Sequence, residues 1–247
     1  MRILGIRVDE IDMAAALDFL AAAINAYQEG GRTSRVVTLN PEGLHLATAD
    51  ADFAQIIENA ALVTADGAGL VWASRRLGRP LSERVTGIDL MQEACARAAQ
   101  EGWRIYLLGA QKGVAEAAAA KLKERFAGLN ICGLHHGYFA GAEERVLAHI
   151  NAAAPQLLFV ALGLPAQERF CAAYENRLNA AVALGVGGSL DVLAGRVKRA
   201  PRLLRRLRLE WLWRLILQPS RLPRMLVIPK FMWKVSREAK ELKRVDI

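Results

Sequence analysis

Leu157-Leu-Phe-Val-Ala-Leu162 is an uninterrupted apolar run, and Gly163-Leu-Pro-Ala-Gln-Glu168 follows it directly. A strand that is apolar on both faces is typical of a parallel sheet covered by helices on each side. Further runs of this character predict strands over residues 35–39, 61–64, 104–108, 130–134 and 180–186. Because they alternate with Ala-rich helical segments, we predict an α/β fold: a Rossmann-like parallel sheet with helices on both faces.

Helical segments follow the predicted strands, and several have a recognisable start. Asp12 and Asp50 are placed to cap helices, and Asn40 is followed by Pro41, a residue favoured at the first helical position. Periodicity predicts later helices over residues 88–100, 114–126, 142–153 and 167–177. These elements predict one α/β body over residues 1–195.

The positive charge is concentrated at the C-terminal end. Residues 196–244 hold sixteen of the 33 Lys and Arg residues and only three acids. The same segment contains Trp211, Trp213, Phe231 and Trp233 among many leucines. A basic, aromatic and leucine-rich end predicts a negative partner, either an anionic membrane surface or a phosphorylated molecule.

We predict that residues 196–247 form an appendage with two amphipathic helices, one from Pro201 to Pro219 and one over residues 225–242. Its outer basic and aromatic side chains, Phe231 and Trp233 among them, are expected to meet the membrane. The alternative is a helix packed on the body or on a second copy of the chain, with solvated arginines.

Neither a signal peptide nor a membrane span is expected. Charged residues interrupt the first ten positions, and no stretch approaches the roughly 20 apolar residues that a span needs. Cys95, Cys132 and Cys171 are odd in number and far apart, which argues against a disulfide framework and a zinc site. A reduced, cytoplasmic compartment fits best.

Ligands of parallel α/β sheets lie beyond the carboxyl ends of the strands, so the residues that follow each strand are the candidates for a site. Here these segments are polar and Gly-rich. They are Thr38-Leu-Asn-Pro-Glu42, Thr64-Ala-Asp-Gly-Ala-Gly69, Gly109-Ala-Gln-Lys-Gly113, Gly163-Leu-Pro-Ala-Gln-Glu168 and Gly185-Val-Gly-Gly-Ser-Leu-Asp191.

Asp66 is the first candidate for chemistry. It is either the N-cap of the next helix or a carboxylate placed to take a proton from a bound hydroxyl, and the two roles are compatible. Arg84 lies in a loop, either solvated or placed to grip a diphosphate. Gln167 is either a surface residue at a helix start or a partner for a sugar hydroxyl.

The Gly-rich turns after residues 108 and 184 are candidates for phosphate binding, because each lies between a strand and a helix. Neither matches a known phosphate-binding motif, so tight-turn glycine is the competing interpretation. Asp191 is either a cap or an acceptor for a base or ribose. Asp50-Ala-Asp52 formally matches a metal-binding DxD pattern, but its helical context favours a cap and a solvated side chain, so no metal site is predicted.

Several motifs, taken together and in order, resemble the WecG/TagA/CpsF glycosyltransferases over essentially the whole chain. They are Thr38-x-Asn40, Thr64-Ala-Asp-Gly67, Arg84-Val-Thr-Gly-x-Asp89, Leu108-Gly109, Gly163-x-Pro-x-Gln-Glu168, Gly185-Val-Gly-Gly-Ser-x-Asp-x-Leu-Ala-Gly195, Arg199-Ala-Pro201 and Glu210-Trp-Leu-Trp-Arg214. The resemblance implies an inverting enzyme without a cofactor or metal. The best-known members move N-acetylmannosamine, or its uronic acid, from UDP onto polyprenyl-diphosphate-linked GlcNAc in cell-wall or surface-polymer synthesis.

The resemblance also implies a role for each matching residue. Asp66 becomes the candidate base and Arg84 a catalytic arginine near the reacting groups. Substrate binding is implied for Thr38, Asn40 and Gln167, and UDP binding for Gly109, Gly163, Gly187, Asp191 and the appendage residues Arg214, Arg221 and Arg224. A lysine that is frequent before the Gln-Glu pair is replaced here by Ala166.

We therefore expect a cytoplasmic enzyme bound peripherally to the inner face of the cell membrane. Its expected partners are a UDP-sugar, polyprenyl-diphosphate-linked GlcNAc and an anionic membrane surface, and no nucleic acid is expected. A homo-oligomer is compatible with the sequence. Alternatives are a UDP-ManNAcA or other UDP-hexose donor, and, from another class, a non-catalytic nucleotide- or nucleic-acid-binding protein.

Overall fold

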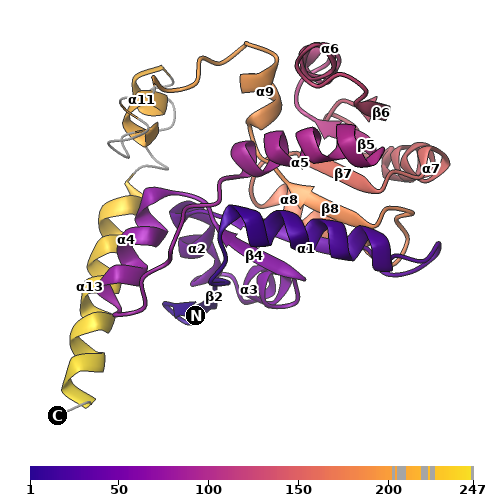
Figure 1. Ribbon diagram of the computed structural model, residues 1–247. Helices are drawn as coiled ribbons and strands as arrows, with labels where there is room; N and C mark the ends of the chain where they lie inside the picture. Colours follow the sequence, from indigo (N-terminus) through magenta and orange to yellow (C-terminus); the bar gives the residue numbers. More distant parts are fainter. Residues whose placement is uncertain (202–203, 205–209, 218–221, 223–225, 246–247) are drawn as a thin grey trace.

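In the computed structural model, a six-stranded sheet forms the centre of the protein (Figure 1). Its strands are β3 (Ser34–Leu39), β4 (Leu62–Ala65), β5 (Arg104–Gly109), β6 (Asn130–His135), β7 (Leu157–Ala161) and β8 (Val182–Gly185). They lie in the order β4-β3-β8-β7-β5-β6, and every neighbouring pair is parallel. The predicted α/β fold is confirmed, and each predicted strand overlaps an observed one.

The structure describes residues 1–201, 204, 210–217, 222 and 226–245. Of Arg214 and residues 243–245, only the backbone is described.

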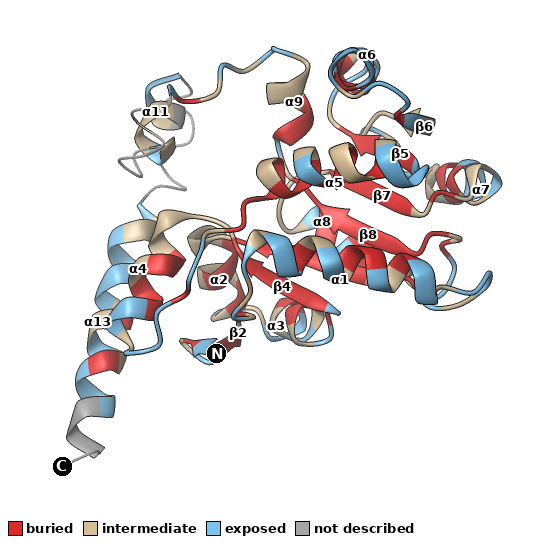
Figure 2. Cartoon of the chain, viewed as in Figure 1, coloured by how far each residue is buried: buried red, intermediate tan, exposed pale blue. Residues whose placement is uncertain are grey.

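Helices cover both faces of the sheet. One face carries α1 (Met13–Ala26), α5 (Gly87–Glu101), α6 (Val114–Arg125) and α9 (Ser189–Leu193). The other carries α2 (Pro41–Ala47), α3 (Ala51–Glu58), α4 (Ala68–Arg76), α7 (Glu143–Ala153) and α8 (Ala166–Tyr174). Leu157 and Phe159 pack on the first face, and Leu158 and Val160 on the second, so β7 is buried on both sides as its sequence predicts (Figure 2).

A topological switch point lies between β3 and β8. These strands are neighbours, but β3 leads into α2 on one face and β8 leads into α9 on the other. In doubly wound sheets, ligands bind at the carboxyl edge beside such a switch point. The loops after β3 and β8 are therefore central to any site.

Side-chain caps start three helices where the sequence predicts them. The caps are Asp12 to the Ala15 amide (2.8 Å), Asn40 to the Gly43 amide (2.8 Å) and Asp50 to the Phe53 amide (2.9 Å). The cap interpretation of Asp66 is wrong, because α4 begins after Gly67, which makes no side-chain cap bond. The helix predicted to reach residue 177 ends at Tyr174.

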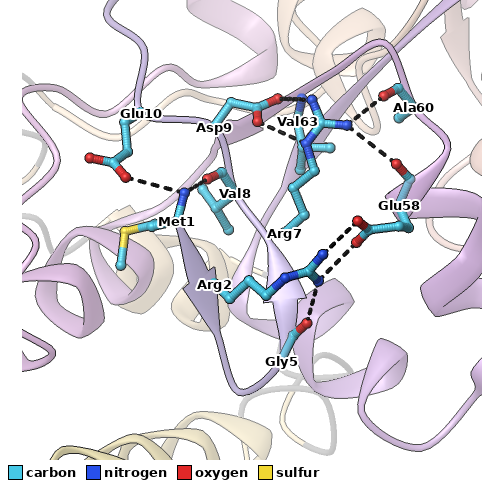
Figure 3. Close-up of polar contacts among 10 residues, drawn as sticks. All are labelled: Met1, Arg2, Gly5, Arg7, Val8, Asp9, Glu10, Glu58, Ala60 and Val63. Atoms are coloured by element: carbon cyan, nitrogen blue, oxygen red, sulfur yellow. Dashed lines mark hydrogen bonds and ion pairs between the residues drawn. The ribbon is translucent and has the colours of Figure 1, made fainter.

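An N-terminal hairpin, β1 (Arg2–Ile3) paired with β2 (Ile6–Arg7), is an element that the sequence patterns did not predict. Two bidentate ion pairs flank it (Figure 3). Arg2 contacts Glu58 of α3 at 2.6 and 2.9 Å, and Arg7 contacts the two carboxylate oxygens of Asp9 through Nε and Nη2, both at 2.9 Å. The exposed Arg2–Glu58 pair contributes at most about 1 kcal/mol. Ile3, which is fully buried, anchors the hairpin in the core.

The appendage contains α11 (Glu210–Leu217) and α13 (Val227–Val245). Along α13, Phe231 and Val235 are fully buried and Ala239 is 4% exposed, and the helix packs on α2 and α4 (Figure 1). Trp233, in contrast, is 62% exposed. The expectation that Phe231 faces a membrane is wrong, because the side chain points into the core. None of the described helices combines the length and apolarity needed to span a bilayer.

Candidate active site

Thr38 joins the two strands at the switch point. It lies near the end of β3, is 7% exposed, and its Oγ1 donates a hydrogen bond to the Gly185 carbonyl of β8 at 2.8 Å. Gly87, the first residue of α5, lies against it, since a Cβ there would come within 3.0 Å of Thr38 Oγ1. The predicted substrate residue Thr38 thus holds the edge of the sheet together, while Asn40, two residues further, caps α2.

Asp66 follows β4 and lies at the start of α5. Its backbone amide donates to the Leu39 carbonyl at 2.7 Å, which aligns the loop with β3. Its Oδ2 accepts from the Gly87 amide at 3.1 Å. The first amides of a helix carry partial positive charge and stabilise a nearby carboxylate. Asp66 is half-buried, oriented by α5, and close to the loop that carries Thr38 and Asn40.

Arg84 is paired with the appendage. Its Nη1 lies 3.4 Å from Glu210 Oε2, at the first turn of α11. Arg199 extends the network, with Nη2 at 2.5 Å from Asp89 Oδ1 and Nε at 3.8 Å from Glu210 Oε1. Four charged side chains thereby connect the loop before α5, α5 itself, the segment after α9 and α11.

Asp89 has a lowered pKa. Burial alone raises it, but the hydrogen bonds from Thr86 and Arg199, with the charges of Arg199 and Arg84, outweigh burial and favour the carboxylate. Thr86 is also the N-cap of α5, and its Oγ1 accepts from the Asp89 amide at 3.2 Å. The network is thus built onto the same helix start that orients Asp66.

Gln167 lies in the first turn of α8 and is 3% exposed. Its Oε1 accepts from the Gly187 amide at 3.0 Å, and its Nε2 donates to Glu168 Oε1 at 2.7 Å. The predicted sugar-binding amide is therefore already engaged on two sides.

The three predicted UDP-binding glycines all have positive φ, at 128° for Gly109, 76° for Gly163 and 52° for Gly187. Gly109 has a further structural reason, because a Cβ there would come within 2.4 Å of the Ala161 carbonyl oxygen. It ends β5, which β7 separates from β8, so it lies apart from the residues at the switch point. Gly163 and Gly187 both contact Gln167: its backbone amide donates to the Gly163 carbonyl at 2.9 Å, and its side-chain Oε1 accepts from the Gly187 amide.

The remaining predicted residues are placed only in part. Asp191 is the third residue of α9, and its carbonyl accepts from the Arg196 and Val197 amides at 2.9 and 3.1 Å. Arg214 lies in α11, with its backbone alone described. Arg221 and Arg224 fall outside the described residues, so their predicted contacts with a diphosphate stay predictions.

Sequence reasoning missed the role of Glu210, which holds Arg84 and contacts Arg199. A signal was available, because Glu210 is one of only three acids among residues 196–244. Glu168 ends the motif Gly163-x-Pro-x-Gln-Glu168, but the sequence predicted no role for its carboxyl. Among the described residues, no group of three or more His, Cys, Asp or Glu side chains is arranged to hold a metal ion. All three cysteines are free thiols.

Fold and site place the chain among the α/β proteins that gather their functional side chains at the carboxyl edge of a doubly wound parallel sheet. The profile of the Glycosyl transferase WecG/TagA/CpsF family matches residues 1–245, so the chain belongs to this family. The resemblance carried by the motifs is confirmed. The chain is a glycosyltransferase, and the alternative of a non-catalytic binding protein is set aside.

Relatives in Staphylococcus aureus strains NCTC 8325, COL and MRSA252 are each 38% identical to this chain over 209 residues. The matched region covers 85% of this chain and 82% of each relative. These relatives are named N-acetylglucosaminyldiphosphoundecaprenol N-acetyl-beta-D-mannosaminyltransferases. The similarity therefore extends over most of the chain.

Proposed function

We propose that this protein transfers N-acetylmannosamine from UDP-N-acetylmannosamine to undecaprenyl-diphosphate-linked GlcNAc, forming a β-1,4-linked lipid disaccharide for teichoic-acid or surface-polysaccharide synthesis. The observation that carries the proposal is the 38% identity over 209 residues to transferases with this acceptor and sugar in their names. The position of Asp66 at the carboxyl edge, oriented by the Gly87 amide, supports it.

In the proposed reaction Asp66 takes the proton of the acceptor hydroxyl. The freed oxygen attacks the anomeric carbon of the donor from the face opposite UDP, and the bond from that carbon to the diphosphate oxygen breaks. The configuration at the anomeric carbon inverts in this single displacement. UDP leaves with the electron pair of the broken bond, and its negative charge must be neutralised.

Fixed arginines, rather than a metal ion, are proposed to meet that charge. Arg84 stands beside the start of α5, and Arg214, Arg221 and Arg224 belong to the appendage sequence. A planar guanidinium binds diphosphate oxygens through two parallel hydrogen bonds, which suits it to this task. Glu210 holds Arg84 before the substrate arrives.

The Asp66→Asn variant tests the proposed base. It keeps an oxygen that can accept from the Gly87 amide but cannot take a proton, so turnover is expected to fall about 100-fold or more. UDP affinity, measured by calorimetry, should stay near that of the wild type. Asp52→Asn is the matched control, because Asp52 is exposed in the first turn of α3. Unchanged turnover in Asp66→Asn would exclude the residue as the base.

The donor and the metal independence are tested together. Transfer to a short-chain lipid-diphosphate-GlcNAc acceptor is measured with UDP-ManNAc, UDP-ManNAcA and UDP-GlcNAc, each with and without EDTA. We expect the highest kcat/KM with UDP-ManNAc and no effect of EDTA. Preference for the uronic acid would reassign the donor, and loss of activity in EDTA would contradict the proposed role of the arginines.

We also propose that the enzyme works at the inner face of the cytoplasmic membrane as a peripheral protein. Apolar side chains with at least 41% exposure lie along the described appendage: Trp211, Ile216, Leu217, Leu222, Leu226, Met232, Trp233 and Leu242. Basic residues near them would each add about 1 kcal/mol at an anionic surface. Sedimentation with phosphatidylglycerol vesicles but not with phosphatidylcholine vesicles is expected, and Ile216→Ser with Trp233→Ser should weaken it.

A further inference from the structure

Glu168 is a buried carboxyl with an unusual environment. It lies in α8, is 3% exposed, and its Oε1 accepts from Gln167 Nε2 at 2.7 Å. Within the described part of the chain, its Oε2 has no hydrogen-bond partner. Burial of a carboxyl oxygen without a partner is costly, and such groups are rare unless they serve a function.

The carboxyl forms one end of a short chain of hydrogen bonds that reaches the switch point. Gln167 connects Glu168 to the Gly187 amide through its two amide atoms. The carboxamide is held tightly, because a Cβ on Gly185 would come within 2.7 Å of Gln167 Nε2. The Gly185 carbonyl also accepts the hydrogen bond from Thr38 Oγ1. The hydrogen bonds of Gln167 and that of Thr38 therefore meet at Gly185.

The orientation of the Gln167 carboxamide is decided by its two neighbours. The Gly187 amide can only donate, so it needs Gln167 Oε1. An ionised carboxylate can only accept, so Glu168 needs Gln167 Nε2. With Glu168 removed, only the bond from the Gly187 amide opposes rotation of the carboxamide, and each rotated carboxamide places Nε2 against that amide, donor against donor.

We propose that Glu168 is a positioning residue for the donor site: through Gln167 it holds the Gly187 amide and fixes the turn over residues 186–188 in the conformation that binds the UDP-sugar. This inference rests on the proposed function. Glu168 itself, being buried beneath Gln167, does not touch the substrate.

Burial raises the pKa of Glu168 to about 7, against the opposing effect of its bond from Gln167. Cys171, on the same helix, interacts electrostatically with Glu168. Arg35 of β3 and Glu175, the C-cap of α8, interact with Cys171 in turn, and Arg35 pairs with Glu175. Because the pKa is higher in the folded than in the unfolded chain, Glu168 favours folding at low pH. That contribution is complete below its ordinary value of 4.5 and is lost as the pH rises through about 7.

The Glu168→Met variant keeps the approximate size of the side chain and removes both carboxyl oxygens. It therefore distinguishes a positioning role of the carboxyl from a role in packing alone. We expect the Tm at pH 8 to rise, because an unsatisfied buried carboxylate is gone. We expect the Kd for UDP, measured by calorimetry, to weaken about tenfold, because the Gln167 carboxamide loses its partner. Glu168→Gln keeps an acceptor oxygen, and its Kd should stay within about threefold of the wild type.

A double-mutant cycle shows whether Glu168 acts through Gln167. In a Gln167→Ala background, Glu168→Met should leave the Kd for UDP unchanged, since the connecting carboxamide is absent. UDP affinity equal to wild type in Glu168→Met, or equal losses in Glu168→Met and Glu168→Gln, would overturn the inference. If Glu168→Met does not fold, Glu168→Ala takes its place in the same comparison. A wild-type protein that binds no UDP contradicts the proposed function and this inference with it.

Discussion

The two helices of the appendage are attached to the body in different ways. α13 packs through apolar side chains, with Phe231 and Val235 fully buried against α2 and α4. α11 contacts the body through the ion pair of Glu210 with Arg84, and within the appendage its Trp213 indole donates to the Lys198 carbonyl at 3.1 Å. Its Ile216 and Leu217 are 63% and 42% exposed.

This difference predicts that the two helices are attached to the body with different firmness. Burial of aromatic and aliphatic side chains does not depend on ion pairs, so α13 is part of the hydrophobic core beneath α2 and α4. The ion pair that holds α11 is partly buried, with Arg84 23% and Glu210 13% exposed, so salt screens it only in part. We expect α11 to be the less firmly attached of the two helices. Most of the basic residues in the two helices lie in the firmly packed one, since α13 contains six Lys and Arg residues and α11 contains only Arg214.

Phe231→Ala should give the largest effect. Truncation of a fully buried phenylalanine costs about 3–5 kcal/mol, so the free energy of unfolding in urea is expected to fall by that amount. Trp233→Ala is the matched control on the same helix, and because Trp233 is 62% exposed the change should stay within about 0.5 kcal/mol. Equal effects of the two variants would mean that α13 is not part of the core.

Glu210→Gln should have an intermediate effect, on activity more than on stability. Loss of the carboxylate releases Arg84 and leaves Arg199 with Asp89 alone, so kcat/KM is expected to fall about fivefold while the unfolding free energy changes by less than about 1 kcal/mol. Amide hydrogen exchange over residues 210–217 should accelerate. Glu241→Gln, which removes the exposed partner of Arg237, is the control. Unchanged exchange in α11 would show that Glu210 does not hold it.

Acid should loosen α11 before α13, and this is the smallest effect. The pKa of Asp89 is lower in the folded chain than in the unfolded chain, so its carboxylate favours the folded state. The contribution is complete above the ordinary value of 3.8 and is lost as the pH falls through the lowered value. Exchange in residues 210–217 should increase over that range ahead of residues 227–242. In Asp89→Asn this step should be absent, and a step that persisted would assign it to another group.

The sheet and most helices could be predicted because their signals are local. Apolar runs, the caps Asp12, Asn40 and Asp50, and Gly-rich turns are each contained in a few consecutive residues. The N-terminal hairpin escaped prediction because two-residue strands carry no periodicity. The burial of Phe231 in the core was also not predicted, because the sequence pattern of an amphipathic helix is the same whether its apolar face contacts a bilayer or a protein core.

The candidate site was predictable residue by residue, but its connections were not. Motifs located Asp66, Arg84 and Gln167, while the pairing of Arg84 with Glu210 joins positions 126 residues apart. The bond between Gln167 and Gly187 likewise depends on β7 and β8 being neighbours. Such contacts follow from the order of the strands in space, which local patterns do not contain.

The place of β8 in the sheet has a consequence for synthesis of the chain. Of the strands in the described residues, β8 is the last to be made, yet it lies between β3 and β7 and joins β3–β4 to β5–β6–β7. Until residues 182–185 leave the ribosome, two partial sheets present unpaired inner edges, which invite aggregation. Completion of the fold and assembly of the switch point then occur in one late step, so a truncated product lacks both.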